Sequence, residues 1–446
     1  MKYLILLLIC AIHQPAKSDF DDAADAYSSK NYQVAFDEFF RLAKLGNKRA
    51  QFNLGVMYLN GEYVEQDYFL AYAWGKLSEH TERPEFSKIR IILEQNLSSQ
   101  NLAKAKQAYD SIDQVYGEEH IYAKLSPIVY QESDKKPKIN SNFNYKIIKR
   151  TAPRYPKQAL NKKHQGWATI GFEIHPDGRV RNPYVIDSFP PEIFENESLK
   201  AVQNFIFEVD FAEETEPFIF HGRQTFEYAL NNQVNSNFLR QHYNKKLAAL
   251  LDAAEQGSAQ AQYLYAIAAS SNLMNKDNKI PQEEVNQWLL RSAQNGHVEA
   301  QFNLGRNILR GKGCQAEKQK GIDWIVYAAE QGHPRSSRTA YSLLTKNNNL
   351  NNTGKPAQFW LKQSAENGDA DSQLDYAEFL ASHENNSSED LLIARKYLEK
   401  QTQTRDKSVK WYQVSAMIYQ QQGEPKKAEK HQKKANKMAN KLGWET

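Results

Sequence analysis

Residues 153–207 decide the fold, and they read PRYPKQALNKKHQGWATIGFEIHPDGRVRNPYVIDSFPPEIFENESLKAVQNFIF. This is the long segment in which apolar residues alternate, whereas most of the remaining chain has helical spacing. The alternation is carried by four residues: Ala168, Ile170, Phe172 and Ile174. Such a period of two predicts a strand with two different faces. Pro176-Asp177-Gly178 then separates this run from a second β-rich run, Val180–Ile186, which predicts a hairpin.

Further elements are expected on both sides of this hairpin. Pro183 predicts that the second strand lies at a sheet edge or contains a bulge. A helix is expected over residues 194–206, because Phe194, Leu199, Val202 and Phe205-Ile206 fall near helical spacing. A short helix, Lys157–Asn161, should follow Pro156. A third strand is indicated by alternating residues: Gln224, Phe226, Tyr228 and Leu230.

The segment resembles the C-terminal domain of the TonB family over roughly residues 147–231. The resemblance lies in P-x-YP-x-x-A, then QGWATIGFEIHPDGRV, then an acidic-flanked helix that ends in aromatic residues. One departure is that Glu208-Val209 follows Phe207, where the family usually has a proline. The resemblance implies a small α/β domain whose sheet edge accepts short extended segments of outer-membrane receptors.

Four residues at the start of the segment are the candidate partner-binding residues: Pro153, Arg154, Tyr155 and Pro156. In the TonB family the segment leading into this motif lies beside the place where partner peptides dock. A structural role is the alternative, because a proline here is pre-organised for the helix that follows and the tyrosine can pack beneath it. Both roles can hold together.

The remaining chain contains repeats. The sequence AQFNLG occurs at Ala50–Gly55 and again at Ala300–Gly305, and each copy is followed by a glycine and then by a helix that bears a tryptophan. Gly296, Gly332 and Gly368 are spaced 36 residues apart. A fixed period of this size predicts a solenoid of helix pairs, with each glycine ending a helix in the left-handed conformation. The motif resembles the Sel-like repeat family, a relative of the tetratricopeptide repeat.

The expected fold class is therefore α+β, with a helical-repeat solenoid on both sides of a small TonB C-terminal-like α/β domain. The expected segments are a signal peptide over 1–18, an N-terminal helical unit over 19–121, a linker over 122–146, the TonB-like domain over 147–231, Sel-like repeats over 245–399 and capping helices over 400–446.

The N-terminus is predicted to be a cleaved signal peptide. Lys2 precedes an apolar run, Leu4–Ile12, and Ala16-Lys17-Ser18 provides a small-x-small site before Asp19. The run is about nine residues long, whereas a membrane span needs about twenty. We expect a periplasmic protein, with an inner-membrane protein anchored by an uncleaved N-terminus as the alternative. Cleavage would lower the formal net charge from +4 to +2, which favours no particular partner.

No catalytic motif is found in the sequence. G-x-S-x-G, H-E-x-x-H and the phosphate-binding G-x-x-x-x-G-K-[ST] are all missing, so we expect no enzyme activity, no cofactor and no metal. Cys314 would be the single cysteine of the mature chain. It is interpreted as a small buried apolar residue, with an intermolecular disulfide as the alternative. His297 and His333 each follow a repeat glycine and are expected at helix turns.

Residues 135–163 form a basic arm with ten Lys or Arg residues and no Asp or Glu. The arm is interpreted either as a solvated linker and helix face or as a surface that contacts anionic lipid headgroups. Nucleic acid is not expected as a partner of an exported protein.

Three functions remain open. The first is a periplasmic adaptor of the cell envelope, which binds envelope proteins through its repeats and through the strand-pairing surface of the TonB-like domain. The second is a TonB-type energy transducer for transport through outer-membrane receptors. The third is an envelope hydrolase, which no residue or motif of the sequence supports. The sequence does not determine the oligomeric state.

Overall fold

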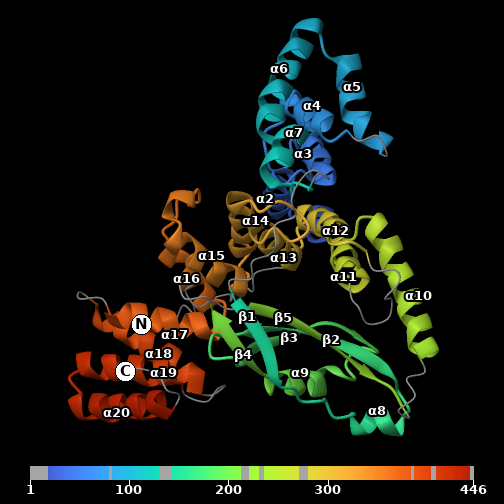
Figure 1. Cartoon of the computed structure of the whole chain (residues 1–446). Helices are drawn as coiled ribbons and strands as arrows, with labels where there is room; N and C mark the ends of the chain where they lie inside the picture. The colour runs from blue at the N-terminus through green and yellow to red at the C-terminus, as the bar shows by residue number, and fades with distance from the viewer. Residues whose placement is uncertain are drawn as a thin grey trace, which may run out of the picture. The chain divides into compact units, whose positions relative to one another are not determined.

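The computed structural model describes residues 19–79, 83–130, 143–211, 220–230, 236–270, 280–382, 386–402 and 408–441. The expected signal peptide lies outside these residues, as do residues 135–142 of the basic arm. The chain divides into two compact units. The first comprises residues 1–126, 293–309 and 317–446, and the second comprises residues 127–292 and 310–316. Figure 1 labels the elements of both units.

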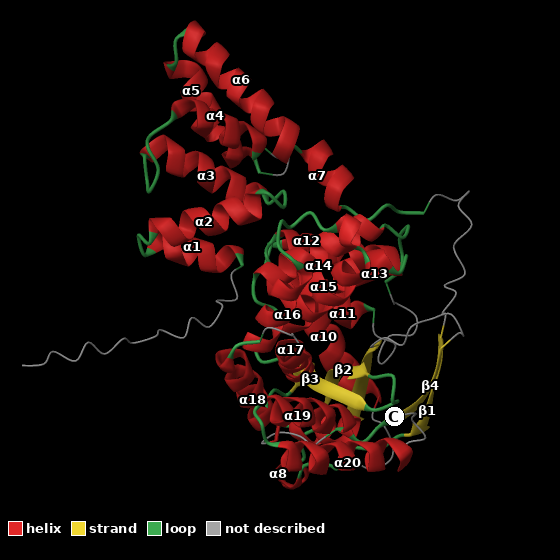
Figure 2. Cartoon of the chain, turned by 90° about the vertical axis from the view of Figure 1, so that its left-hand side faces the viewer, coloured by secondary structure: helices red, strands yellow, loops and turns green. Residues whose placement is uncertain are grey.

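The described part of the first unit is helical (Figures 1 and 2). Its N-terminal helices are α1 (Phe20–Ser28), α2 (Tyr32–Ala43), α3 (Lys48–Asn60), α4 (Tyr68–Leu77), α5 (Lys88–Asn96), α6 (Ser99–Tyr116) and α7 (Glu118–Leu125), with the 3-10 turn η1 (Pro84–Ser87) before α5. Its later helices are α13 (Val298–Leu309), α14 (Lys318–Glu330), α15 (Pro334–Lys346), α16 (Ala357–Glu366), α17 (Ala370–Ser382), α18 (Ser388–Thr402), α19 (Val409–Gln421) and α20 (Pro425–Lys441), with the short turn η2 (Asn348–Leu350) after α15. The two helices expected in the tail are thus confirmed.

The repeat glycines end helices as expected. Their φ angles are positive: Gly46 86°, Gly257 98°, Gly296 95°, Gly332 76° and Gly368 93°. At Gly332 the glycine N–H bonds the Ala329 carbonyl, and the N–H of the next residue bonds the Ala328 carbonyl. This pair of bonds is the Schellman motif, which provides donors for backbone carbonyls that have no hydrogen-bond partner within the helix.

The residue after each glycine caps the helix that follows. Asn47, Ser258 and Asp369 use side-chain oxygens for this purpose, and His297 and His333 use Nδ1. Each cap accepts the backbone N–H three residues further on, at 2.8 to 3.3 Å. One glycine and one capping residue therefore reverse the chain between consecutive helices. The expectation that both histidines lie at helix turns is confirmed.

A buried glutamine forms a hydrogen bond across most of these turns. The amides of Gln51, Gln262, Gln301 and Gln373 each donate to an alanine carbonyl eight residues earlier, at 3.0 to 3.3 Å. The turn at Gly332 has Ser337 at the equivalent position. Its shorter side chain donates to the His333 carbonyl instead.

The glycine of each AQFNLG copy lets two helices approach closely. A Cβ added to Gly305 would lie 2.7 Å from the Gly321 carbonyl oxygen of α14. At Gly55 an added Cβ would lie 3.0 Å from the Gly75 nitrogen of α4. Since both distances are below ordinary contact, a side chain would push the helices apart. These glycines within the helices therefore allow the close helix contacts of the repeats.

The second unit contains the strands (Figure 2, yellow). They are β1 (Phe143–Lys149), β2 (Gly166–Ile174), β3 (Val180–Phe189), β4 (Ile206–Phe211) and β5 (Phe220–Tyr228). The helices of this unit are α8 (Lys157–Asn161), α9 (Glu195–Gln203), α10 (Ser236–Glu255), α11 (Ala259–Ala269) and α12 (Gln282–Gln294), whose last residues belong to the first unit. The described strands pair antiparallel as a β3-β2-β5 sheet and a β1-β4 ribbon.

The hairpin, the helix α8 and the third strand are confirmed, and every residue of β2 is buried. One face of β2 packs into a core with α9 through Ala168, Ile170 and Phe172. On the other face, the Trp167 ring contacts Tyr243 of α10 at 5.6 Å. The two faces expected from the alternation are therefore both covered, and the polar side chains between the apolar ones are enclosed as well.

Two expectations for this unit are wrong. The helix over residues 194–206 ends at Gln203, and Ile206 begins β4 instead. Strand β1 is a further difference, because it begins at Phe143 within the stretch 122–146 that we expected to be a linker. Both differences have one cause, since β1 and β4 pair with each other across more than 50 residues of sequence.

A candidate strand edge in the TonB-like domain

The β3-β2-β5 order leaves two outer strands in the described sheet. Strand β2 lies between the others, so β3 and β5 each have one paired strand neighbour among the described residues. An outer strand can pair with an extended peptide if its backbone is regular. The two outer strands differ in this respect.

Strand β3 is irregular. Its register against β2 shifts twice, between Thr169 and Ile170 and between Gly171 and Glu173. Asn182 has a φ of 49°, and Pro183 follows it without a backbone N–H. The expected bulge and edge position are thus confirmed. Proline and bulges are the features that prevent an outer strand from pairing further.

Strand β5 is regular. It pairs with β2 residue for residue from Gly166 opposite Tyr228 to Ile174 opposite Phe220, without a register shift. It contains no proline. The Arg223 and Glu227 side chains are exposed, and Arg223 Nη1 donates to the Ile267 carbonyl of α11 at 3.4 Å, whereas Phe226 and Tyr228 belong to the core beneath the sheet. The outer side of β5 is therefore the edge of this sheet that is suited to accept another strand.

The predicted residues Pro153, Arg154, Tyr155 and Pro156 lie beside the end of β5. The half-buried Tyr155 ring contacts Tyr228, the last residue of β5, with centroids 5.6 Å apart. The Tyr155 hydroxyl donates to the His164 carbonyl. Burial raises the pKa of Tyr155 and raises the pKa of Tyr228 to about 12, so both phenols stay protonated. Tyr155 therefore packs against the domain, which is the structural role that we considered as the alternative to partner binding.

The other members of the motif differ in exposure. Pro156 is the residue that precedes the first turn of α8, where its fixed φ of −61° suits a helix start. Arg154 is exposed, and Pro153 is partly exposed. Arg154 is thus the member of the motif best placed to contact a partner, and binding by these four residues stays a prediction.

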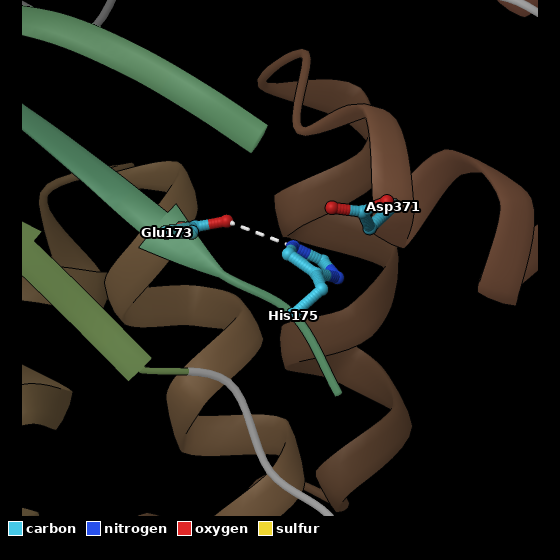
Figure 3. Close-up of side chains that lie close together, drawn as sticks. All are labelled: Glu173, His175 and Asp371. Carbon is cyan, nitrogen blue, oxygen red and sulfur yellow. Dashed lines mark ion pairs between the residues drawn. The ribbon is translucent and has the colours of Figure 1, made fainter. Parts of the chain in front are cut away.

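Sequence reasoning did not single out a buried acid at the opposite end of β5. Glu173 of β2 is fully buried, and its Oε2 accepts a hydrogen bond of 2.7 Å from the Asn182 amide. His175 Nε2 lies 3.5 Å from Oε2, and His221 Nε2 of β5 lies 3.6 Å from Oε1. Figure 3 shows the pair of Glu173 and His175.

This group connects the three strands of the sheet at the hairpin end. A buried carboxylate in a sheet is stable only when its oxygens accept hydrogen bonds, and the Asn182 amide of β3 donates to one of them. The signal that could have revealed the group is a glutamate within a strand whose neighbours are apolar.

Two family models match the chain. The model described as Gram-negative bacterial TonB protein C-terminal matches residues 151–230, and the Sel1 repeat model matches residues 48–78, 298–333 and 351–369. The chain contains a TonB C-terminal domain flanked by Sel1 repeats. The matched domain contains β2, β3 and β5, whereas β1 precedes it.

The similar curated proteins are two TonB proteins. Protein TonB of Klebsiella pneumoniae is 27% identical over 73 residues, which cover 16% of this chain and 30% of that protein. Protein TonB of Escherichia coli (strain K12) is 30% identical over 63 residues, which cover 14% of this chain and 26% of that protein. The chain therefore spans less than a third of the length of these relatives.

Two solved structures are similar at a low level. A Sel1 repeat protein from Oxalobacter formigenes has a TM-score of 0.35 and 21% identity, over 46% of this chain and 84% of that chain. A protective antigen present in uropathogenic Escherichia coli strains, displaying an SLR fold, has a TM-score of 0.35 and 16% identity, over 95% of this chain and 73% of that chain. At these TM-scores the likeness supports no conclusion about function.

None of the helices in the described ranges combines the length and the apolar character that crossing a membrane requires. Cys314, expected to be a small buried residue, is buried, with its Sγ 3.8 Å from the Lys312 carbonyl oxygen.

Proposed function

We propose that this protein is a periplasmic adaptor of the cell envelope. It binds one partner through its Sel1 repeats and another through the outer edge of β5 in its TonB C-terminal domain. Two types of binding module in one chain, together with a sequence that has no catalytic motif, support this function. Apart from the linker over 122–146, into which α7 and β1 extend, the domain boundaries are proposed as given from the sequence.

The observation that carries the proposal is the regular outer edge of β5. An extended peptide would add to this edge and gain main-chain hydrogen bonds, while its side chains meet the exposed Arg223 and Glu227. Pro153 to Pro156 would line the end of the added strand, because Tyr155 packs on the last residue of β5. By the resemblance to TonB, the peptide is a short segment of an outer-membrane receptor.

The Sel1 repeats supply the second surface. Stacked helix pairs expose one face of each pair along the array, and such arrays bind protein partners over an extended surface. A protein that brings a receptor segment and a second envelope protein together would act as a scaffold.

A TonB-type energy transducer is the second candidate, and the match to Protein TonB favours it. The two candidates differ in one measurable property. A transducer changes its contacts when the proton gradient across the inner membrane is dissipated, whereas a scaffold keeps them. An inner-membrane anchor at the N-terminus would fit the transducer.

A photo-crosslinking amino acid tests the edge in cells. It replaces Arg223 or Glu227 on β5, and Val185, which is 39% exposed on the irregular strand β3, is the matched control. We expect crosslinks to an envelope protein from the two β5 positions and none from position 185. Equal labelling from all three positions, or none from β5, would refute binding at this edge. Repeating the β5 experiment after dissipating the proton gradient distinguishes scaffold from transducer.

A further inference from the structure

The helix α20 carries a stripe of lysines on its outer side. The buried side of α20 faces α19 and consists of small residues, with Ala428, Ala435 and Ala439 at most 6% exposed. Six exposed lysines occupy the rest of the helix: Lys426, Lys427, Lys430, Lys433, Lys434 and Lys437. At about 100° per residue they fall within an arc of about 120°, opposite the alanines. We call these six residues the lysine stripe.

The charge of the stripe is little compensated. Glu429 is the single acidic residue of α20 and pairs with Lys433 at 2.6 Å, and Glu424 before the helix pairs with Lys427. Among the ion pairs of the described residues, the other four lysines take part in none. The stripe is therefore a strongly positive surface about 16 Å long, from the helical rise of 1.5 Å per residue.

The chemistry of the stripe indicates what it binds. Protein interfaces are built around aromatic residues and arginine. The sequence of α20 contains no arginine, tyrosine, tryptophan or phenylalanine, and none of the exposed large apolar side chains of the described residues lies on it. The nearby Tyr419 and Tyr412 rings of α19 lie beneath Lys427 and Lys434, at 5.3 and 5.5 Å. Lysine acts as a point charge on a flexible stem and does not require one fixed geometry of its partner. Such a surface fits a dense array of mobile negative charges better than a shaped protein site.

We propose that the lysine stripe holds the first unit against an anionic phospholipid surface by electrostatic attraction, without insertion into the bilayer. Each lysine near such a surface adds to the attraction, and the sum falls steeply with salt because the charges are exposed. This inference does not depend on the β5 edge. It also names a different surface from the basic arm, 135–163, where lipid contact was considered from the sequence.

Vesicle sedimentation with the full-length chain tests the proposal. The probes are vesicles of phosphatidylcholine alone and vesicles that contain about one third phosphatidylglycerol, each at low and high salt. One variant changes four stripe residues to glutamine: Lys426, Lys430, Lys434 and Lys437. The matched control makes the same change at four exposed lysines of the basic arm: Lys149, Lys157, Lys162 and Lys163.

We expect the unmodified chain and the control to bind the anionic vesicles within twofold of each other, and the stripe variant to bind at least tenfold more weakly. Binding should be lost at high salt and with phosphatidylcholine alone. A variant with arginine at the four stripe positions keeps the charge and should bind like the unmodified chain, which separates charge from folding.

Three outcomes overturn the proposal. The first is that the basic-arm variant loses binding while the stripe variant retains it. The second is that anionic vesicles do not bind the chain at low salt, even if an acidic protein or nucleic acid does. The third is binding that does not respond to salt.

Discussion

Glu299 of α13 joins two neighbouring repeats, and its replacement by glutamine tests what holds them together. His333 Nε2 lies 3.1 Å from Glu299 Oε1, and the Arg335 guanidinium pairs with the same oxygen. His333 also caps α15, because its Nδ1 accepts the Ser336 N–H at 3.2 Å. In the neutral ring Nε2 therefore carries the proton that is donated to Glu299.

The residues around Glu299 stabilise the ionised form of its carboxyl group. Burial alone would raise the pKa of Glu299, but His333 and Arg335, with His297 at the start of α13, hold the pKa well below its usual range. The Glu299→Gln variant leaves Arg335 facing a neutral amide. Hydrogen bonds to charged groups contribute about 1.5–3 kcal/mol each. Because the Glu299 side chain is 27% exposed and thus partly screened, we expect a loss of about 1–2 kcal/mol in unfolding free energy.

The loss should depend on pH in a defined direction. A carboxylate whose pKa is lowered on folding stabilises the protein above the unfolded-state pKa of about 4.3, and this contribution disappears as the pH falls toward the folded-state pKa. The difference between the unmodified chain and Glu299→Gln should therefore be complete at neutral pH. It should shrink once the pH falls below about 4.

Urea unfolding followed by tryptophan fluorescence measures this difference, because Trp324 and Trp360 are fully buried in the same repeats. Glu366→Gln is the matched control. The Glu366 side chain is 54% exposed, and its Oε1 lies 3.8 Å from Lys362 Nζ. Loss of this exposed ion pair should change the unfolding free energy by less than about 0.5 kcal/mol. The reasoning is refuted if both variants behave alike at neutral pH, or if the Glu299→Gln deficit is unchanged at acidic pH.

Three further substitutions probe the repeats, each by urea unfolding. Gly305→Ala should lower the unfolding free energy by about 2–3 kcal/mol, because its Cβ would lie 2.7 Å from a backbone oxygen. Gly368→Ala, where no atom lies within 4 Å of the added Cβ, should lower it by about 1 kcal/mol through the left-handed backbone alone. A larger loss for Gly368→Ala than for Gly305→Ala would contradict the close approach of the helices. Gln301→Leu should lower the unfolding free energy by about 1–2 kcal/mol, because it removes the bond to the Ala293 carbonyl and the bond from the Gln331 amide. An unchanged midpoint would show that these two bonds contribute nothing. Asn47→Ala should cost about 2 kcal/mol and speed hydrogen exchange in α3; normal exchange there would contradict its capping role.

The parts of the fold that the sequence predicted are those with local causes. Asp177-Gly178 specifies the hairpin within a few residues, and Gly178 adopts a φ of 73°. The repeat glycines likewise act on the helix directly before them. For this reason the ends of the repeat helices, the hairpin and α8 could be predicted without knowing any distant contact.

The β1-β4 ribbon could not be predicted in this way. The sequence of β1, FNYKIIK, is short and does not alternate cleanly, and its partner begins at Ile206. Phe205-Ile206 fits the apolar spacing of α9 as well as the start of a strand. Only pairing with β1 decides between the two, and that pairing is non-local.

The candidate site was half predicted. Alternation indicated β5 as a strand, but which strands are outermost depends on the order in the sheet and not on any one segment. The motif around Tyr155 was predicted from the sequence, but its position beside β5 is seen only in the structure, where the Tyr155 ring contacts Tyr228. The Glu173 group was missed because its three partners come from β3, from β5 and from the end of β2.

The helices before and after the TonB C-terminal domain are also less separate than their sequence positions indicate. The Asn47 amide donates to Asn295 Oδ1 at 2.7 Å, and the Gln294 amide donates to the Leu45 carbonyl at 3.0 Å. The Trp324 indole donates to the Leu125 carbonyl at 2.8 Å. These buried and half-buried bonds all lie within the first unit, which the chain leaves after Ser126 and re-enters at Ala293. The segment that contains the domain is therefore inserted into one helical unit.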